Sequence, residues 1–220
     1  MRRFYVAGLC RARPECNLWY NTAMKNFSLA MFGAAIAGLC GCALFKSDPK
    51  PNVLTPEEEV QGWTLLWDGD DPTNGWVDVS AGSSNFTARG WSVVNGALVA
   101  TPEADPIRTS VPFKDFDLKA DYRLAPEAAV RILYFHNAET NADTSISYPL
   151  TPLPPEAKDP HAWQSVRIVA RRQSITHWLD GRIIDRKKRD DAELQGRIVL
   201  APGGGTVEFR NVKIRTFGKW

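Results

Sequence analysis

The sequence predicts an all-β fold, an antiparallel β-sandwich, over residues 54–220. Three observations support this prediction. About nine short apolar runs of strand length follow one another, with turn signals between them, as in sandwich domains. Residues 116–124 alternate apolar and charged side chains, the pattern of a strand with one buried face. Sixteen Gly and fifteen Pro among 220 residues favour a turn-rich chain over a helical bundle.

The first expected elements are a short helix and a hairpin. Thr55-Pro56-Glu57-Glu58 has the spacing of a capping box with proline at the first helical position, which predicts a helix of one or two turns. The apolar run over 63–67 ends at a turn. Strands over 91–94 and 97–100 then flank Asn95-Gly96, a dipeptide typical of tight hairpin turns.

The central segments supply the expected core. The apolar positions of 116–124 are predicted to point inward, and the segments over 130–135 and 166–171 form two further strands. Between them, residues 137–162 form a proline-rich stretch, and a loop of this length is usually functional or disordered. The predicted core residues are Phe116, Leu118, Tyr122, Ile168, Val207 and Phe209.

The last segments complete the sandwich. Strands over 175–179 and 182–184 flank Asp180-Gly181, a second hairpin signal. Strands over 197–200 and 206–215 follow. The basic run Arg186–Arg189 between these segments is interpreted as part of a solvated loop, with contact to anionic lipid as the alternative.

The cysteines and the net positive charge of the chain are both concentrated in its first 42 residues, the leader. All four cysteines and a net charge of +4 lie within residues 1–42, whereas residues 43–220 carry a net charge of −2. The body therefore has no disulfide, no thiolate zinc site and no cysteine nucleophile. The whole chain has a net charge of +2, which gives no reason to expect nucleic acid as a partner.

The leader has the pattern of a lipoprotein signal. Lys25 precedes an apolar run over 27–39, which is too short to span a bilayer. The run ends in Leu39-Cys40-Gly41-Cys42, which resembles the bacterial lipobox and predicts lipidation at Cys42. Acyl chains there would hold the protein at a membrane of the bacterial cell envelope, at the outer membrane and facing the periplasm or the cell surface. A plain secretory signal or a buried apolar helix are the alternatives.

The predicted organisation has three parts. Residues 1–42 form the leader, whose first 23 residues are either a mis-assigned extension before Met24 or a long basic n-region. Residues 43–53 form a polar, proline-rich tether. Residues 54–220 form the sandwich domain.

A set of segments in the body, in this order, resembles the 3-keto-disaccharide hydrolase domain family, formerly a domain of unknown function. The resemblance covers about residues 54–216 and implies a concanavalin-like jelly roll whose concave sheet holds sugar. It also implies cleavage of 3-keto-glucosides by elimination and hydration, which amounts to hydrolysis. The matching segments are Leu54–Glu58, Gly62–Gly69, Gly75-Trp76, Trp91–Val99, Phe116–Leu124, His161–Gln164, Val166–Ile168, Trp178–Gly181 and Gly196–Ile214.

That chemistry needs an acid, a base and a group that holds an enolate oxygen. We expect the catalytic residues to be Asp121, Arg131 and His136, and the sugar-binding residues to be Arg123, Tyr134 and Tyr148. The hypothesis is that Asp121, Arg123 and either Arg131 or His136 converge on one pocket. The six tryptophans at 63, 67, 76, 91, 163 and 178 are either core residues or platforms for sugar rings.

No cofactor is indicated, although a divalent metal could take the place of the arginine. The three histidines lack metal-ligand spacing, so no metal site is predicted. The expected partners are a carbohydrate and, through the lipid anchor, a membrane. The alternative function is a non-catalytic carbohydrate-binding or structural envelope module on the same fold.

Overall fold

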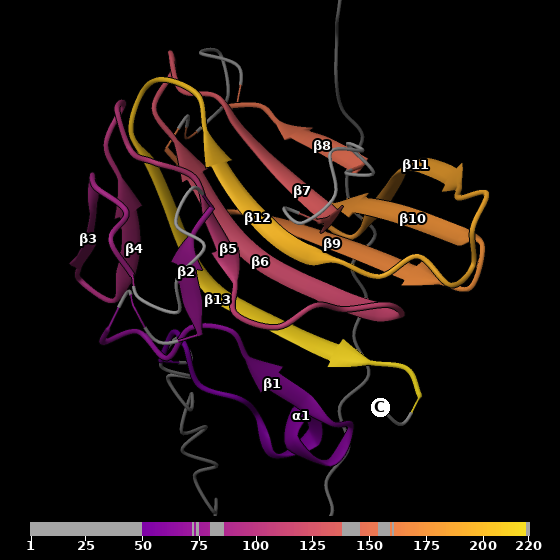
Figure 1. Ribbon diagram of the computed structural model, residues 1–220. Helices are drawn as coiled ribbons and strands as arrows, with labels where there is room; N and C mark the ends of the chain where they lie inside the picture. Colours follow the sequence, from indigo (N-terminus) through magenta and orange to yellow (C-terminus); the bar gives the residue numbers. More distant parts are fainter. Residues whose placement is uncertain are drawn as a thin grey trace, which may run out of the picture. The chain divides into compact units, whose positions relative to one another are not determined.

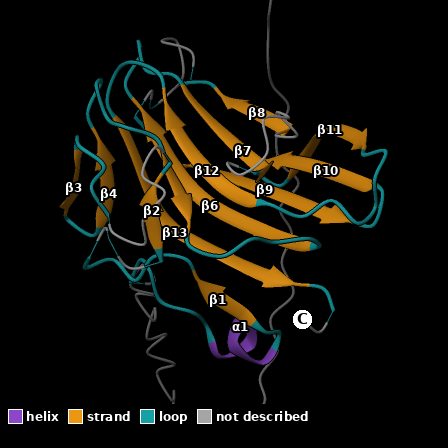
Figure 2. Ribbon diagram, viewed as in Figure 1, coloured by secondary structure: helices purple, strands orange, loops and turns teal. Residues whose placement is uncertain are grey.

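The computed structural model describes residues 50–71, 73, 75–79, 86–137, 146–153, 159 and 161–218. Within these ranges the chain forms one short helix and thirteen strands, and the strands build two antiparallel sheets (Figure 1 and Figure 2). The predicted all-β sandwich is therefore confirmed. The leader, Cys42 and most of the tether lie outside the described residues. No helix in the described part of the chain has the length and apolarity that a membrane crossing needs.

The larger sheet, sheet A, has eight strands in the order β11-β10-β9-β6-β13-β4-β3, with β1 also paired to β13. Its strands are β1 (Trp63–Leu65), β3 (Trp91–Val94), β4 (Ala97–Ala100), β6 (Phe116–Leu124), β9 (Gln164–Arg171), β10 (Ser174–Leu179), β11 (Arg182–Lys188) and β13 (Val207–Thr216).

The smaller sheet, sheet B, has five strands in the order β2-β5-β12-β7-β8. Its strands are β2 (Trp76–Asp78), β5 (Ile107–Thr109), β7 (Val130–His136), β8 (Ile146–Leu150) and β12 (Arg197–Pro202). Consecutive strands often lie in different sheets, so the chain crosses repeatedly from one layer to the other.

The core fills the space between the two sheets. Alternate residues of β6 point inward, and all six predicted core residues belong to the buried cluster. Phe116, Leu118 and Tyr122 from β6 are almost completely buried there. Burying one such side chain stabilises the fold by about 1.5–3 kcal/mol relative to leaving it exposed. The charged positions of β6 consequently lie on the opposite face of sheet A.

Local signals in the sequence produce the expected ends and turns. Helix α1 (Pro56–Val60) begins with the predicted capping box, in which Thr55 and Glu58 exchange hydrogen bonds. Both predicted hairpins form, β3–β4 and β10–β11. The turn residues Asn95 and Asp180 have φ values of 50° and 46°, and a glycine with positive φ follows each one. Two successive positive φ values are what a tight primed turn requires.

Three strands of sheet B were not expected from the sequence. β2 and β5 have three residues each and are buried throughout, so they show no alternation of apolar and polar residues. β8 lies inside the stretch 137–162 that was predicted to be a loop, which corrects that prediction for Ile146–Leu150. It contains Pro149, which the sheet tolerates because β8 is an edge strand.

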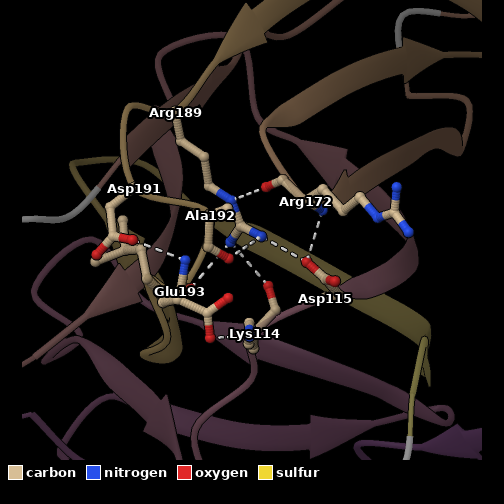
Figure 3. A network of polar contacts seen from close by, with 8 residues as sticks. Lys114, Asp115, Arg172, Arg189, Asp191, Ala192 and Glu193 are labelled. Carbon is tan, nitrogen blue, oxygen red and sulfur yellow. Dashed lines mark hydrogen bonds and ion pairs between the residues drawn. The ribbon is translucent and has the colours of Figure 1, made fainter.

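The basic run Arg186–Arg189 is not a solvated loop. Its first three residues belong to β11, and the side chain of Arg189 is almost fully buried. Figure 3 shows the Arg189 guanidinium donating hydrogen bonds to the Asp115 carboxylate and to the backbone carbonyls of Lys114, Arg172 and Ala192. The guanidinium also donates to the backbone carbonyl of Leu194. These hydrogen bonds hold the segment between β11 and β12 against the residues just before β6.

Candidate functional site

The polar face of sheet A is the face turned away from sheet B, and it carries the candidate site. Along β6 this face presents Asp117, Lys119, Asp121 and Arg123, and the Cα atoms of successive members are about 6.6 Å apart. Neighbouring strands add charged residues of their own at paired positions. Across β6 and β13 the pairs Arg123–Glu208, Asp121–Arg210 and Asp117–Arg215 join opposite charges, whereas Lys119 lies between two other cations, Lys213 and Arg167.

Asp117 anchors two arginines on this face. Its carboxylate is fully buried and accepts two hydrogen bonds from Arg167, each 2.7 Å long, and one of 2.8 Å from Arg215. The hydrogen bond to Asp117 raises the pKa of Arg167 above its ordinary value, although burial opposes this. The paired geometry fixes the position of the Arg167 guanidinium, which also lies 5.1 Å from the ring centre of Trp178.

A pocket of about 440 Å³ opens on the polar face beside this arginine. Four strands and one turn contribute to it. Its wall includes Trp178 from β10 and the turn residue Gly181. The remaining lining residues are Lys119, Ala120, Asp121, Ser165, Val166, Arg167, Asn211 and Lys213. We call this hollow the sheet A pocket.

Lys119 is the cation of the pocket that makes no ion pair within the described residues, since Arg167 pairs with Asp117 and Lys213 with Glu58. Its ammonium lies 4.4 Å from the ring centre of Trp63. Burial lowers the pKa of Lys119, and the neighbouring charges of Arg167 and Lys213 lower it further, against the opposing effect of Asp117. A half-buried lysine of this kind suits the binding of an anionic oxygen.

Asp121 is positioned by two asparagines. Its Oδ2 accepts a hydrogen bond of 2.6 Å from Asn211, and Arg210 lies 3.5 Å away. Asn211 and Asn52 each donate a backbone N–H to the other's side-chain oxygen, at 2.7 Å in both directions. Both asparagines have φ in the left-handed region, and Asn211 lies where the register of β13 shifts. This bulge turns the Asn211 amide toward Asp121.

A second hollow of about 320 Å³ lies on the same face, over β3, β4, β6 and β13. Arg123 makes a bidentate ion pair with Glu208 there, with distances of 3.1 and 2.5 Å. The guanidinium groups of Arg123 and Arg210 lie 4.9 and 4.2 Å from the ring centre of Trp163. Trp163 and Trp178 are only partly buried, whereas Trp67 and Trp76 belong to the core.

The structure places two of the six predicted site residues on one face, where they line different hollows, and it separates the other four from them. Asp121 and Arg123 lie on the polar face of sheet A. Arg131, Tyr134 and His136 lie on β7 and Tyr148 on β8, both in sheet B. The expectation that Arg131 or His136 would join Asp121 is therefore wrong. It assumed that the strand after β6 pairs with it, whereas the chain crosses to the other sheet after Leu124.

Tyr134 and Tyr148 instead surround a histidine inside the sandwich. The Tyr134 hydroxyl lies 2.9 Å from Nε2 of His177, and the Tyr148 ring stacks on the imidazole with centres 4.5 Å apart. Asp185 Oδ2 lies 3.7 Å from Nδ1 of the same ring. Burial lowers the pKa of His177 to about 4, although Asp185 opposes this shift. The imidazole is therefore neutral at neutral pH.

The sequence interpretation gave no role to Lys119, Asn211 or His177. Lys119 lies in the same alternating strand as Asp121, so its face was predictable. Asn211 left a signal in the apolar pattern, which runs 207, 209 and then 212, 214, and such a change of parity indicates a bulge. Within the described ranges, no group of three or more His, Cys, Asp or Glu residues is arranged to hold a metal ion.

Comparison with known proteins agrees with this architecture. A family model described as the 3-keto-alpha-glucoside-1,2-lyase-like domain matches residues 62–215. Among solved structures, a candidate glycosyl hydrolase from Parabacteroides distasonis aligns with a TM-score of 0.64 and 22% identity, covering 77% of this chain and 100% of its own. Among curated proteins, no sequence matches this chain.

Two glucanases share the fold at lower identity. A β-glucanase from Bacillus licheniformis aligns with a TM-score of 0.52 and 8% identity over 71% of this chain and 97% of its own. An endo-β-1,3-glucanase from Pyrococcus furiosus aligns at 0.50 and 14%, over 72% and 96%. These likenesses establish the jelly-roll sandwich. Residues 47–220 form one compact unit by themselves.

Proposed function

Because the chain belongs to the family of 3-keto-alpha-glucoside-1,2-lyase-like domains, we propose that it cleaves 3-keto-glucosides and 3-keto-disaccharides in the sheet A pocket. The observation that carries this proposal is the pairing of Asp121 with Lys119, two residues apart on β6 and both lining one hollow beside Trp178. Their Cα atoms are about 6.6 Å apart along the strand, and both side chains line the same hollow, so they can act on one bound sugar ring.

Asp121 is the proposed base. A ketone at C3 acidifies the proton on C2, and the carboxylate takes that proton while the C–H electron pair forms the enolate. The hydrogen bond from Asn211 occupies Oδ2 and so orients the remaining oxygen for this transfer. The enolate then expels the glycosidic oxygen from C1, and protonated Asp121 returns the proton to it. Addition of water across the resulting enone completes a net hydrolysis.

Lys119 is the proposed holder of the enolate oxygen. Negative charge develops on the C3 oxygen as the C2 proton leaves, and a fixed cation there lowers the barrier. Lys119 is suited to this role because it makes no ion pair within the described residues and is half-buried, where charge interactions are stronger than in water. Trp178 offers an apolar ring face to the sugar, and the volume of the pocket lies within the usual range for small-molecule sites.

The test is an assay of the purified fragment 50–220 on 3-keto-trehalose and 3-keto-sucrose, followed by the release of free monosaccharide. Asp121→Asn keeps the shape of the side chain and removes the base, so we expect kcat to fall by about 10²–10⁴-fold. Glu127→Gln, an exposed carboxylate changed in the same way, is the matched control and should retain full activity. Equal activity of Asp121→Asn and the parent would contradict the proposal.

A non-catalytic sugar-binding module is the second candidate. The ion pairs Arg167–Asp117, Lys213–Glu58 and Arg123–Glu208 favour it, because paired charges make a rigid binding surface more readily than a reactive one. Calorimetric binding of the same sugars without any turnover would support this candidate in place of the enzyme.

We further propose that lipid on Cys42 holds the domain at a membrane of the bacterial cell envelope. The lipobox-like sequence at residues 39–42 and the tether after it support this proposal. Cys42→Ala in the full chain should prevent lipidation, so the protein should leave the detergent phase in a phase-partition experiment. Unchanged partitioning of the variant would contradict the anchor.

A further inference from the structure

The edge strand β11 has features that the proposed sugar site does not use. It is the last strand of sheet A, and among the described residues only β10 pairs with it. Figure 1 shows β11 and β3 at opposite ends of the sheet. The backbone groups along its outer edge have no strand partner in the described part of the chain, so this edge is open to an external surface.

The side chains of β11 are mostly basic. Arg182, Arg186, Lys187 and Lys188 are exposed, and Asp185 is the single acidic residue of the strand. Asp185 lies 3.5 Å from Lys187 and 3.7 Å from the His177 ring, so it compensates at most one of these cations. Seven consecutive residues therefore carry a net charge of +3 on one edge.

Two large apolar side chains lie within this basic strand. Ile183 and Ile184 are 45% and 46% exposed, which is unusual for isoleucine beside a packed sheet. Lysines alone would be explained as protection of an edge strand against pairing. Exposed isoleucines work against such protection, because they make an open edge more prone to association.

We propose that β11 docks the domain on an anionic phospholipid surface. Its four basic side chains contact headgroup phosphates, and Ile183 and Ile184 enter the region between the headgroups and the acyl chains. Basic residues near a charged bilayer and apolar residues at its interface both contribute to peripheral binding. This contact is distinct from the sugar site, and it does not depend on cleavage.

The length of the chain is compatible with docking beside a lipid anchor. Asn52 is held on β13 by its hydrogen bonds to Asn211, and β11 lies four strand positions away, or about 19 Å across the sheet. Residues 43–52 can span at most ~35 Å when fully extended. A lipid on Cys42 and the β11 edge can therefore reach the same bilayer.

The test uses the fragment 50–220, which lacks the apolar leader, in co-sedimentation with vesicles. Binding is compared between vesicles of phosphatidylglycerol and phosphatidylcholine in a one-to-two ratio and vesicles of phosphatidylcholine alone. We expect at least about tenfold tighter binding to the anionic vesicles and loss of this difference at high salt, where charges are screened. Equal binding to both vesicle types, or binding to neither, would overturn the proposal.

Matched variants test whether vesicle binding depends on β11 in particular or on positive charge anywhere on the domain. Arg186→Glu should weaken binding to anionic vesicles by at least about fivefold, whereas Arg131→Glu, the same change on an exposed residue of sheet B, should alter it by less than about twofold. The double variant Ile183→Ser/Ile184→Ser should weaken binding to anionic vesicles by about tenfold relative to the parent fragment. Equal effects of the two arginine changes, or a β11-dependent affinity for an anionic polysaccharide with no affinity for vesicles, would overturn the assignment.

Discussion

Two places in this domain gather titratable side chains, and they differ in what surrounds them. The sheet A pocket is lined by ions that face solvent, while the cluster around His177 lies between the sheets and is neutral at neutral pH. The first can act on a bound molecule because its charged side chains line a hollow that opens to solvent. Burial keeps the imidazole of the second neutral, so we expect it to affect the stability of the fold.

The sequence hypothesis placed Tyr134 and Tyr148 in the site, whereas the structure places both beside His177 between the sheets. Tyr134, Tyr148 and His177 have the chemistry of acids and bases, yet stacking and one hydrogen bond occupy them in the core. Lys119 and Asp121 have ordinary strand positions and lie in a pocket. Accessibility therefore distinguishes the two groups better than residue type does.

Apart from the change at Asp121 described above, the largest expected effect is on Lys119. Lys119→Met keeps most of the volume of the side chain and removes the charge that would hold the enolate, so kcat/KM on 3-keto-trehalose should fall by about 10²–10³-fold. The melting temperature should hold or rise slightly, because a half-buried ammonium is replaced by an apolar group. A kinetic assay and a thermal melt on the same preparation check both. An unchanged kcat/KM would contradict the proposal that Lys119 holds the enolate oxygen in the sheet A pocket.

A smaller effect concerns stability in acid. His177 has a pKa of about 4 in the folded protein and an ordinary value near 6.5 when unfolded, so between these pH values only the unfolded state binds the proton. Stability is therefore fully present above about pH 6.5 and is lost as the pH falls toward 4, by at most about 3 kcal/mol.

Urea titrations at several pH values measure this slope. His177→Gln fills much of the same space without titrating in this range, so the variant should lose stability at neutral pH and show a flatter dependence between pH 6.5 and 4. A slope identical to that of the parent would mean that other groups cause it.

The smallest expected effect is on Arg131. Arg131→Ala should change the free energy of unfolding by no more than about 0.5 kcal/mol and leave sugar cleavage unaffected, since the side chain is exposed on sheet B. Denaturant unfolding and the sugar assay measure the two quantities. A large loss of activity would restore the original hypothesis that Arg131 belongs to the site.

Local patterns in the sequence were sufficient for much of the fold. The alternation in 116–124 identified both faces of β6, and Asn95-Gly96 and Asp180-Gly181 identified both hairpins. Each of these features depends on residues adjacent in the chain. The face that carries Asp121 and Arg123 was predictable for the same reason.

Features that depend on distant residues were not predictable in this way. The contact between Asn52 and Asn211 joins residues 159 positions apart, and nothing near either residue indicates the other. The assignment of β7 to sheet B depends on where the chain goes after Leu124, which is a property of the whole jelly roll. The sequence therefore predicted which residues share the polar face of β6, but not the sheet to which β7 belongs.

The central claim is that sugar binds against Trp178 in the sheet A pocket. A crystal structure of Asp121→Asn with 3-keto-trehalose tests it most directly, because the variant should bind the substrate without turning it over. We predict a sugar ring beside Trp178, with its C3 oxygen within hydrogen-bond distance of the Lys119 ammonium and its C2 facing residue 121. A sugar bound on sheet B, or on sheet A away from Lys119, would contradict the account.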